Sequence, residues 1–145
     1  MADVTGTPGK VAFELVSPER LLASEDVDMV VAPGAGGDFG VLPEHSPLMS
    51  LLRPGVIEIY DGDNITQRIF VGGGFAEVNE KGCTVLAEEA LRVDDIDVAE
   101  AEKRIKLAQD DLASADDEVT KAKLERDIKV AEAMIDATKS GSASH

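Results

Sequence analysis

The chain changes character sharply near residue 94, and this break limits what it can fold into. Of the 13 glycines, 12 lie at or before Gly82, and all six prolines lie at or before Pro54. Residues 95–139 contain neither residue type. Because glycine and proline favour turns and interrupt helices, the sequence predicts a turn-rich first half followed by a helix-rich second half.

The first half carries short apolar runs that are separated by turn signals. The runs most typical of strands, rich in β-branched residues, are residues 11–16, 27–31, 56–60 and 65–71. Loops that contain glycine follow at residues 61–64 and 79–82, and each joins two apolar runs, which is a hairpin pattern. Many short strands with frequent turns predict a β-sandwich or a barrel.

The second half carries two amphipathic segments, each with one apolar seam at steps of three and four residues. The seam positions are Val98, Ala101, Ile105, Ala108 and Leu112, then Leu124, Ile128, Ala131, Ile135 and Thr138. Only residues 113–116 separate the two, so the sequence predicts an antiparallel helical hairpin over residues 95–139. Because buried alanine contributes less than buried leucine, we expect the hairpin to be the less stable half.

Local signals give the expected ends of these helices. Asp94 or Asp95 is expected to cap the first helix, and Ser114 with Asp117 resembles a capping box for the second. The segments 1–9 and 140–145 are small and polar, and we expect both to be disordered.

Charge and composition exclude several classes of function. The formal net charge is −15, so we expect no nucleic-acid binding and no direct binding to anionic lipid. Cys83 is the single cysteine, which rules out an internal disulfide and indicates a reducing compartment. No apolar run approaches the ~20 residues that span a bilayer, so membrane association is expected only through partner subunits.

The residues that could carry chemistry form no recognisable catalytic set. His45 has no second histidine except His145 to share a metal with, and Cys83 has no activating motif around it. The glycine-rich stretch 33–40 lacks the Gly-Lys-Ser/Thr of a phosphate loop, and the paired aspartates fit no calcium-binding loop. The sequence therefore predicts no enzyme activity, no metal and no cofactor. A stand-alone β-sandwich that binds a small ligand remains an alternative, and an enzyme would need a constellation that the sequence does not display.

Three motifs, found in order along the chain, resemble one known family. They are Gly40-Val41-Leu42-Pro43-Glu44-His45-Ser46-Pro47-Leu48 followed by Pro54-Gly55, then Gly73-Gly74-Phe75-Ala76-Glu77-Val78, then Val85-Leu86-Ala87-Glu88-Glu89-Ala90. This pattern resembles the epsilon subunit of bacterial F-type ATP synthases, the counterpart of the mitochondrial delta subunit. The resemblance covers about residues 10–139.

The resemblance implies a fold and a role. The fold is a flattened β-sandwich of about ten strands over residues 10–94, followed by the helical hairpin. The role is that of a noncatalytic central-stalk, or rotor, subunit that couples the c-ring to the gamma subunit. It would be peripheral, at the cytoplasmic face of the bacterial inner membrane.

The resemblance also implies which residues contact the other subunits. The resemblance implies that the c-ring is contacted by five residues, namely Asp38, Phe39, Gly40, Glu44 and His45. It also implies that Ser17 lies near gamma. In relatives the hairpin can adopt an extended regulatory form. In that form the residues expected to contact the alpha/beta catalytic head are Lys121, Lys123, Arg126 and Lys129. These cations alternate with acids, which equally suits ordinary pairing along a solvated helix.

A nucleotide motif of the family is degenerate in this chain. Many relatives carry I/L-D-x-x-R-A at the start of the first helix, where it binds ATP. Here Ile96, Asp97 and Ala101 match, but Glu100 occupies the arginine position, and Arg104 lies one turn further on. Because a carboxylate repels a triphosphate, we expect no ATP binding.

Overall fold

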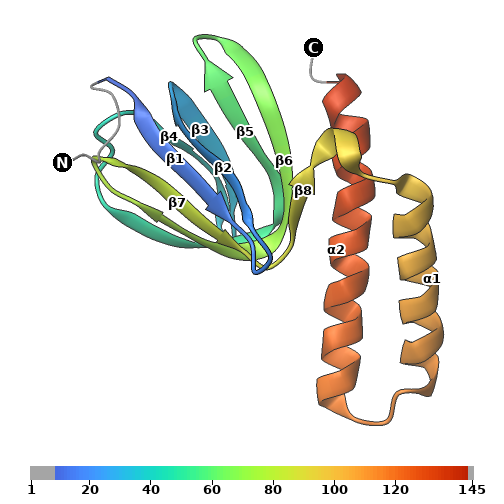
Figure 1. The fold of residues 1–145 in the computed structure, drawn as a ribbon. Coiled ribbons are helices and arrows are strands. Elements are labelled where there is room, and N and C mark those ends of the chain that lie inside the picture. Colours follow the sequence, from blue (N-terminus) through green and yellow to red (C-terminus); the bar gives the residue numbers. More distant parts are fainter. Residues whose placement is uncertain (1–8, 144–145) are drawn as a thin grey trace. The chain divides into compact units, whose positions relative to one another are not determined.

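The structure is a computed structural model, and it describes residues 9–143. It consists of eight strands followed by a 3-10 turn and two helices (Figure 1). The chain divides into two compact units, with the boundary between Arg92 and Val93.

The first unit is a β-sheet unit. Its strands are β1 (Val11–Val16), β2 (Leu21–Val27), β3 (Met29–Gly34), β4 (Gly37–Val41), β5 (Leu48–Asp61), β6 (Asn64–Val78), β7 (Gly82–Ala87) and β8 (Ala90–Arg92). They form one hydrogen-bonded path in the order β2-β1-β7-β6-β5-β3-β4, and β8 also pairs with β6. The β1–β7 pair is parallel and the others are antiparallel.

The two long strands β5 and β6 pair with several other strands. Strand β6 pairs with β8 through residues 69–71 and with β7 through residues 74–78. Strand β5 pairs with β6 along nearly its whole length, and it also pairs with β3 through residues 58–60 and, nearer its start, through Leu52. The predicted β-sandwich is confirmed, and the structure builds it from eight strands where about ten were expected.

The core of this unit consists mainly of aliphatic side chains. Among the members that are almost fully buried are Val11, Phe13, Leu15, Val30, Val41, Ile57, Ile59, Ile69, Val71, Val78 and Val85. They alternate along their strands with outward residues, as a sheet with one buried face requires. Strand β2 is not evident in the sequence, because only Ala23 and Val27 of its seven residues are buried.

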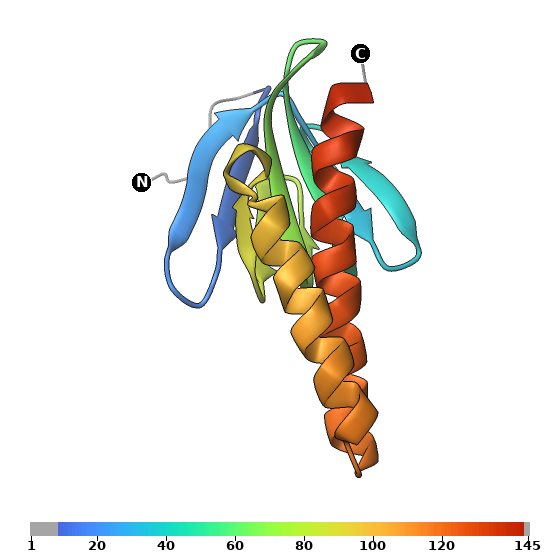
Figure 2. The same ribbon diagram turned by 90° about the vertical axis from the view of Figure 1, so that its right-hand side faces the viewer.

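The second unit is a helical hairpin. After the 3-10 turn η1 (Val93–Asp95), α1 (Val98–Ser114) and α2 (Glu118–Ala143) lie side by side and antiparallel (Figure 2). The predicted seam residues Ala101, Ala108 and Ala131 are buried. Helix α2 also buries Val130, Met134 and Ala137, which lie outside the predicted seam, and this helix contacts η1 as well as α1.

The helix caps differ from the sequence prediction at two places. Asp97 caps α1, because the predicted caps Asp94 and Asp95 belong to the 3-10 turn. The Ser114 hydroxyl donates to the Asp111 carbonyl oxygen at 3.2 Å, so it completes α1 instead of capping α2.

The predicted disordered ends fall largely outside the description. Helix α2 continues to Ala143, so residues 140–143 are helical and not part of a disordered tail. Residues 1–8 and 144–145 lie outside the described residues. Within residues 9–143, neither helix is long and apolar enough to cross a membrane.

Candidate functional site: the outer face of the sandwich and its turns

An apolar row crosses the outer face of five neighbouring strands. Strand register places Leu51 opposite Phe75, Phe75 opposite Leu86, Leu86 beside Val16, and Val16 opposite Leu21. Residues paired in this way point to the same face of a sheet. We call these five residues the apolar row.

The apolar row is open to solvent. The exposed fractions are 66% for Leu51, 54% for Leu86 and 56% for Leu21, and the other two members are half-buried. Met49, two residues before Leu51 on the same face, is 63% exposed. A contiguous exposed apolar patch on a soluble domain marks a surface that another molecule covers. Sequence reasoning did not find this row.

Ser17, the predicted gamma-facing residue, lies directly next to this row. It follows Val16 in the β1–β2 turn, where its backbone amide donates to the Arg20 carbonyl oxygen at 2.9 Å. Its hydroxyl lies 3.3 Å from the same oxygen. The turn therefore fixes Ser17, which is half-buried, directly after Val16 of the row.

A polar groove of about 590 Å³ adjoins the apolar row on the same sheet face. Its lining includes Glu14, Ser24, Asp26 and Thr84 from β1, β2 and β7. The groove is open to solvent and lies outside the sandwich core. It therefore belongs to the same outer surface as the apolar row.

The five predicted c-ring-facing residues divide into two groups. Asp38, Phe39 and Gly40 lie on the edge strand β4, whereas Glu44 and His45 lie in the following turn. Phe39 packs against the core, so its ring supports the fold as well as the surface. The Asp38 carboxylate accepts a hydrogen bond from Arg53 Nη2 at 2.6 Å.

The turn that holds Glu44 and His45 is locally constrained. Glu44 has a φ of 62°, in the left-handed region that few residues other than glycine adopt. The His45 Nδ1 atom lies 2.5 Å from the carbonyl oxygen of Ser46. The ring is thus held by its own turn. Within the described residues, no group of three or more metal-ligating side chains is assembled.

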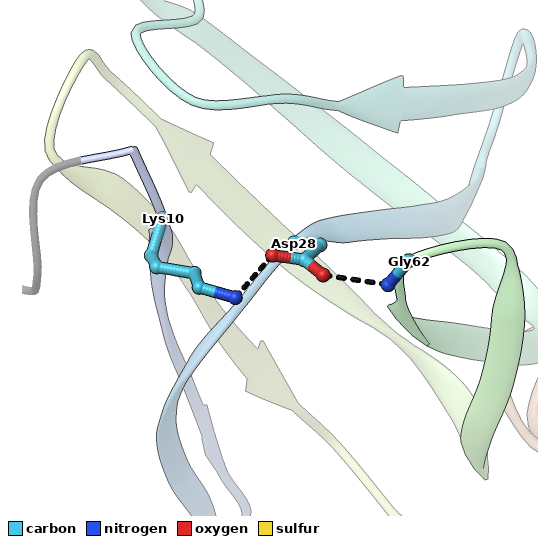
Figure 3. Close-up of polar contacts among 3 residues, drawn as sticks. All are labelled: Lys10, Asp28 and Gly62. Atoms are coloured by element: carbon cyan, nitrogen blue, oxygen red, sulfur yellow. Dashed lines mark hydrogen bonds and ion pairs between the residues drawn. The ribbon is translucent and has the colours of Figure 1, made fainter.

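Lys10, Asp28 and Gly62 tie three separate segments of the sandwich together (Figure 3). The Lys10 ammonium donates to Asp28 Oδ1, and the Gly62 amide donates to Asp28 Oδ2 at 2.6 Å. The hydrogen bond from Lys10, followed by that from Gly62, lowers the pKa of Asp28 below its ordinary value. The same bond to Asp28 raises the pKa of Lys10. This contact holds the β5–β6 hairpin turn against the start of β3.

Cys83 lies in the sandwich core and not at a reactive site. Its side chain is almost fully buried on β7. Burial raises the pKa of its thiol to about 12, because the thiolate would have to form in apolar surroundings.

The polar residues of the degenerate nucleotide motif make their contacts within helix α1. Asp97 Oδ1 accepts the backbone amide of Glu100 at 3.2 Å and so caps α1. Glu100 itself pairs with Lys103 at 3.4 Å, and Ala101 is buried. Ile96 is half-buried just before the helix. The Asp97 and Glu100 carboxylates are therefore engaged in local helix structure.

Arg104 lines a shallow groove of about 280 Å³ along the hairpin. Acidic side chains share this groove, namely Glu100, Asp111 and Asp127. Three carboxylates around the cations Lys103 and Arg104 oppose the approach of a polyphosphate.

The predicted inhibitory cations are spread along α2. Lys121 is half-buried and lies 3.9 Å from the Glu118 carboxylate, whereas Lys123, Arg126 and Lys129 are exposed at separate positions. The structure does not gather these four side chains into one site.

Comparisons with known proteins agree on one family. The family profile described as ATP synthase, Delta/Epsilon chain, beta-sandwich domain matches residues 10–93. The chain is 51% identical over 127 residues to the ATP synthase epsilon chain of Rhodospirillum rubrum, which covers 88% of this chain and 95% of the relative. It is 53% identical over 125 residues to that of Paramagnetospirillum magneticum, covering 86% and 94%.

Solved structures share the fold at lower identity. A chain of the Euglena gracilis mitochondrial ATP synthase, solved as an OSCP/F1/c-ring assembly, matches with a TM-score of 0.74 and 24% identity, covering 94% of this chain and 85% of that one. A chain of the Tetrahymena thermophila mitochondrial ATP synthase central stalk and c-ring matches with a TM-score of 0.61 and 12% identity, covering 93% and 99%. The family profile and the close relatives together show that this chain belongs to the delta/epsilon chain family of ATP synthases.

Proposed function

We propose that this chain is a noncatalytic central-stalk subunit of a proton-translocating ATP synthase, in which it couples the c-ring to the gamma subunit. The observation that carries this proposal is the apolar row on the outer face of the sandwich. A subunit that transmits torque needs a large, rigid contact surface, and the row is an exposed surface on a packed two-layer scaffold. Family membership leaves the alternative of a stand-alone ligand-binding sandwich without support.

The two candidate contact regions would serve different partners. The apolar row, with Ser17 at its end, is the proposed gamma-binding surface. The start of β4, which carries Asp38, and the β4–β5 turn, which carries Glu44 and His45, are the proposed surface for the polar loops of the c-ring. The chain would then lie at the cytoplasmic face of the bacterial inner membrane, held there through these subunits.

We infer that any regulatory contact of the hairpin with the alpha/beta catalytic head is modest. The four cations of α2 are spread along the helix, and Lys121 lies near an acid of its own helix. Exposed ion pairs of this kind contribute only ~0.2–1 kcal/mol each, so exchanging them for contacts with the head yields little net free energy.

The test of the gamma contact is a pair of matched substitutions on the same domain. Leu86→Glu places a charge in the middle of the apolar row, whereas Ile65→Glu places one at an exposed apolar position outside the row. Leu86 is exposed, so its replacement should leave the unfolding midpoint of the isolated chain nearly unchanged. We expect Leu86→Glu to weaken binding to the purified gamma subunit at least about tenfold, as loss of a central interface residue does.

Both substitutions must be compared in the same binding measurement. Ile65→Glu should bind gamma as the unmodified chain does. Equal binding by the two variants would refute the assignment of the apolar row. Failure of this chain to co-purify with the other subunits from native membranes would refute the proposed function as a whole.

A further inference from the structure

The turn between β3 and β4 is built almost entirely of glycine, yet it has a defined shape. It runs Gly34-Ala35-Gly36-Gly37 and ends at Asp38 on the edge strand β4. A Cβ atom placed on Gly36 or Gly37 would meet nothing within 4 Å, so no packing surrounds the tip of the turn. A glycine-rich segment loses the most conformational entropy when it becomes ordered, so contacts at its base must hold it.

Arg53 on β5 supplies those contacts at both ends of the turn. Its Nη1 donates to the Gly34 carbonyl oxygen at 2.6 Å, and its Nη2 donates to Asp38 Oδ1 at 2.6 Å. One planar guanidinium therefore joins Gly34, the first residue of the turn, to Asp38, which follows the turn. The Ala35 amide adds a third tie to β5, donating to the Leu51 carbonyl oxygen at 2.8 Å.

These contacts affect the order of the turn more than the stability of the whole domain. The Arg53 side chain is 46% exposed and that of Asp38 is 61% exposed. Exposed ion pairs contribute little to the free energy of unfolding of a whole domain. The same bonds can nevertheless decide whether one surface turn is ordered, because local openings are governed by the few contacts of that segment.

We propose that Arg53 is a positioning residue that holds the Gly34–Asp38 turn in the conformation that docks on the partner. Under the proposed function, on which this inference rests, that partner is the set of polar loops of the c-ring. Arg53 acts through the turn and not by touching the partner. It also neutralises Asp38, so the docking surface does not bury an unpaired carboxylate.

The first test measures the order of the turn in the isolated full-length chain. The variants are Arg53→Met, which removes both hydrogen bonds, and Arg53→Lys, whose single ammonium cannot hold both acceptors in the same fork. Lys81→Met is the matched control, since it removes one exposed cation from a different turn of the same domain. Amide hydrogen exchange is read at Ala35, and the Gly72 amide, bonded to the Glu89 carbonyl oxygen at 2.8 Å, serves as an internal reference.

We expect Arg53→Met to speed exchange at Ala35 at least about tenfold, toward the rate of an unstructured segment, and to leave Gly72 unchanged. The exchange rate at Ala35 in Arg53→Lys should lie between those of the unmodified chain and Arg53→Met. Lys81→Met should change the exchange rate of neither amide. Unchanged exchange at Ala35 in Arg53→Met would overturn the inference. Equal acceleration at Ala35 and Gly72 would also overturn it, because Arg53 would then support the whole domain.

The second test measures docking in the assembled enzyme. Each variant is titrated into membrane-embedded ATP synthase depleted of this subunit, and recovery of ATP-driven proton pumping is followed. If about one fifth of the Arg53→Met turns remain in the docking conformation, half-maximal recovery needs about fivefold more protein. Lys81→Met should match the unmodified chain.

A rescue variant separates positioning from direct contact. Gly36→Ala reduces the freedom of the disordered turn, and its methyl group meets no neighbour. Added to Arg53→Met, it should slow amide exchange at Ala35 relative to Arg53→Met alone and recover part of the lost docking. Loss of docking with Ala35 exchange unaffected, or with no rescue, would mean that Arg53 touches the partner directly and would overturn the inference. If the unmodified chain restores no pumping, the proposed function fails instead, and the Ala35 measurement still reports on the turn.

Discussion

Gly74 offers a sharp test of how the β6–β7 pair is built. Its φ is +143°, a conformation that residues with a side chain rarely adopt. A Cβ atom at this position would lie 2.3 Å from the Leu86 carbonyl oxygen and 2.9 Å from the Ala87 Cα atom. Both are backbone atoms of the neighbouring strand, so no side chain can move aside to make room. The substitution Gly74→Ala must therefore separate the two strands or change the backbone.

The cost can be assembled from separate physical effects. A residue held in an unfavourable φ region costs about 1–3 kcal/mol. Strand separation also weakens ladder hydrogen bonds, each worth about 0.5–1.5 kcal/mol net. The smaller entropy of the unfolded alanine chain returns only ~0.4–1 kcal/mol. We therefore expect a net loss of about 2–3 kcal/mol, which lowers the melting temperature of a domain of this size by roughly 8–24 °C.

Gly36→Ala is the matched control for this measurement. Gly36 has no positive φ, and a methyl group there would have no atom within 4 Å, so its substitution should be neutral or slightly stabilising. Thermal and urea unfolding of both variants, followed by circular dichroism, gives the comparison. A melting temperature of Gly74→Ala within about 3 °C of the unmodified chain would show that β7 does not approach β6 as closely as described.

Four other properties of the chain can be tested in the same way. The lowered pKa of Asp28 contributes stability above the ordinary aspartate pKa near ~4, and this stability is lost as pH falls through the folded-state pKa. Asp28→Asn should therefore lower the urea midpoint at pH 7 and make that midpoint decrease less steeply on acidification. A urea midpoint that decreases as steeply in the variant as in the unmodified chain would count against the Lys10 contact. The Cys83 thiol, with its pKa raised to about 12, should resist iodoacetamide at pH 8 until urea unfolds the chain, and rapid labelling of the folded chain would contradict its burial. Calorimetry should detect no ATP binding because Glu100 replaces the motif arginine, and micromolar affinity would prove this wrong. Truncation after Asp94 should change ATP hydrolysis by the assembled enzyme within about twofold, since exposed pairs of α2 are weak; a tenfold rise would show a strong brake.

Much of the architecture could be predicted because it depends on local signals. The glycine-containing loops at residues 61–64 and 79–82 mark hairpins, and strands β5, β6 and β7 end or begin within two residues of them. The change of composition near residue 94 lies close to the boundary between the two compact units. The cap of α1 could not be assigned correctly because three aspartates occur within four residues there, and only the 3-10 turn decides that Asp97 is the cap.

The apolar row could not be predicted in the same way. Its members come from five strands between Val16 and Leu86, and each is a single exposed apolar residue in the sequence, which by itself means little. Only the register of four strand pairings brings them together. Arg53 shows the same limit, since its two acceptors lie 15 and 19 residues away along the chain.

The two units differ in how firmly they are built, and this difference bears on what each can do. The sandwich is held by fully buried phenylalanine, leucine, isoleucine and valine side chains, each worth about 1.5–3 kcal/mol on burial. Among the described residues of α1 and α2, four of the six that are buried are alanines, which contribute far less. A contact surface that must transmit force can only be built on the first kind of core, because force would otherwise be absorbed by local unfolding. The hairpin's alanine seam buries less apolar area, so we expect its helices to separate at a modest cost in free energy.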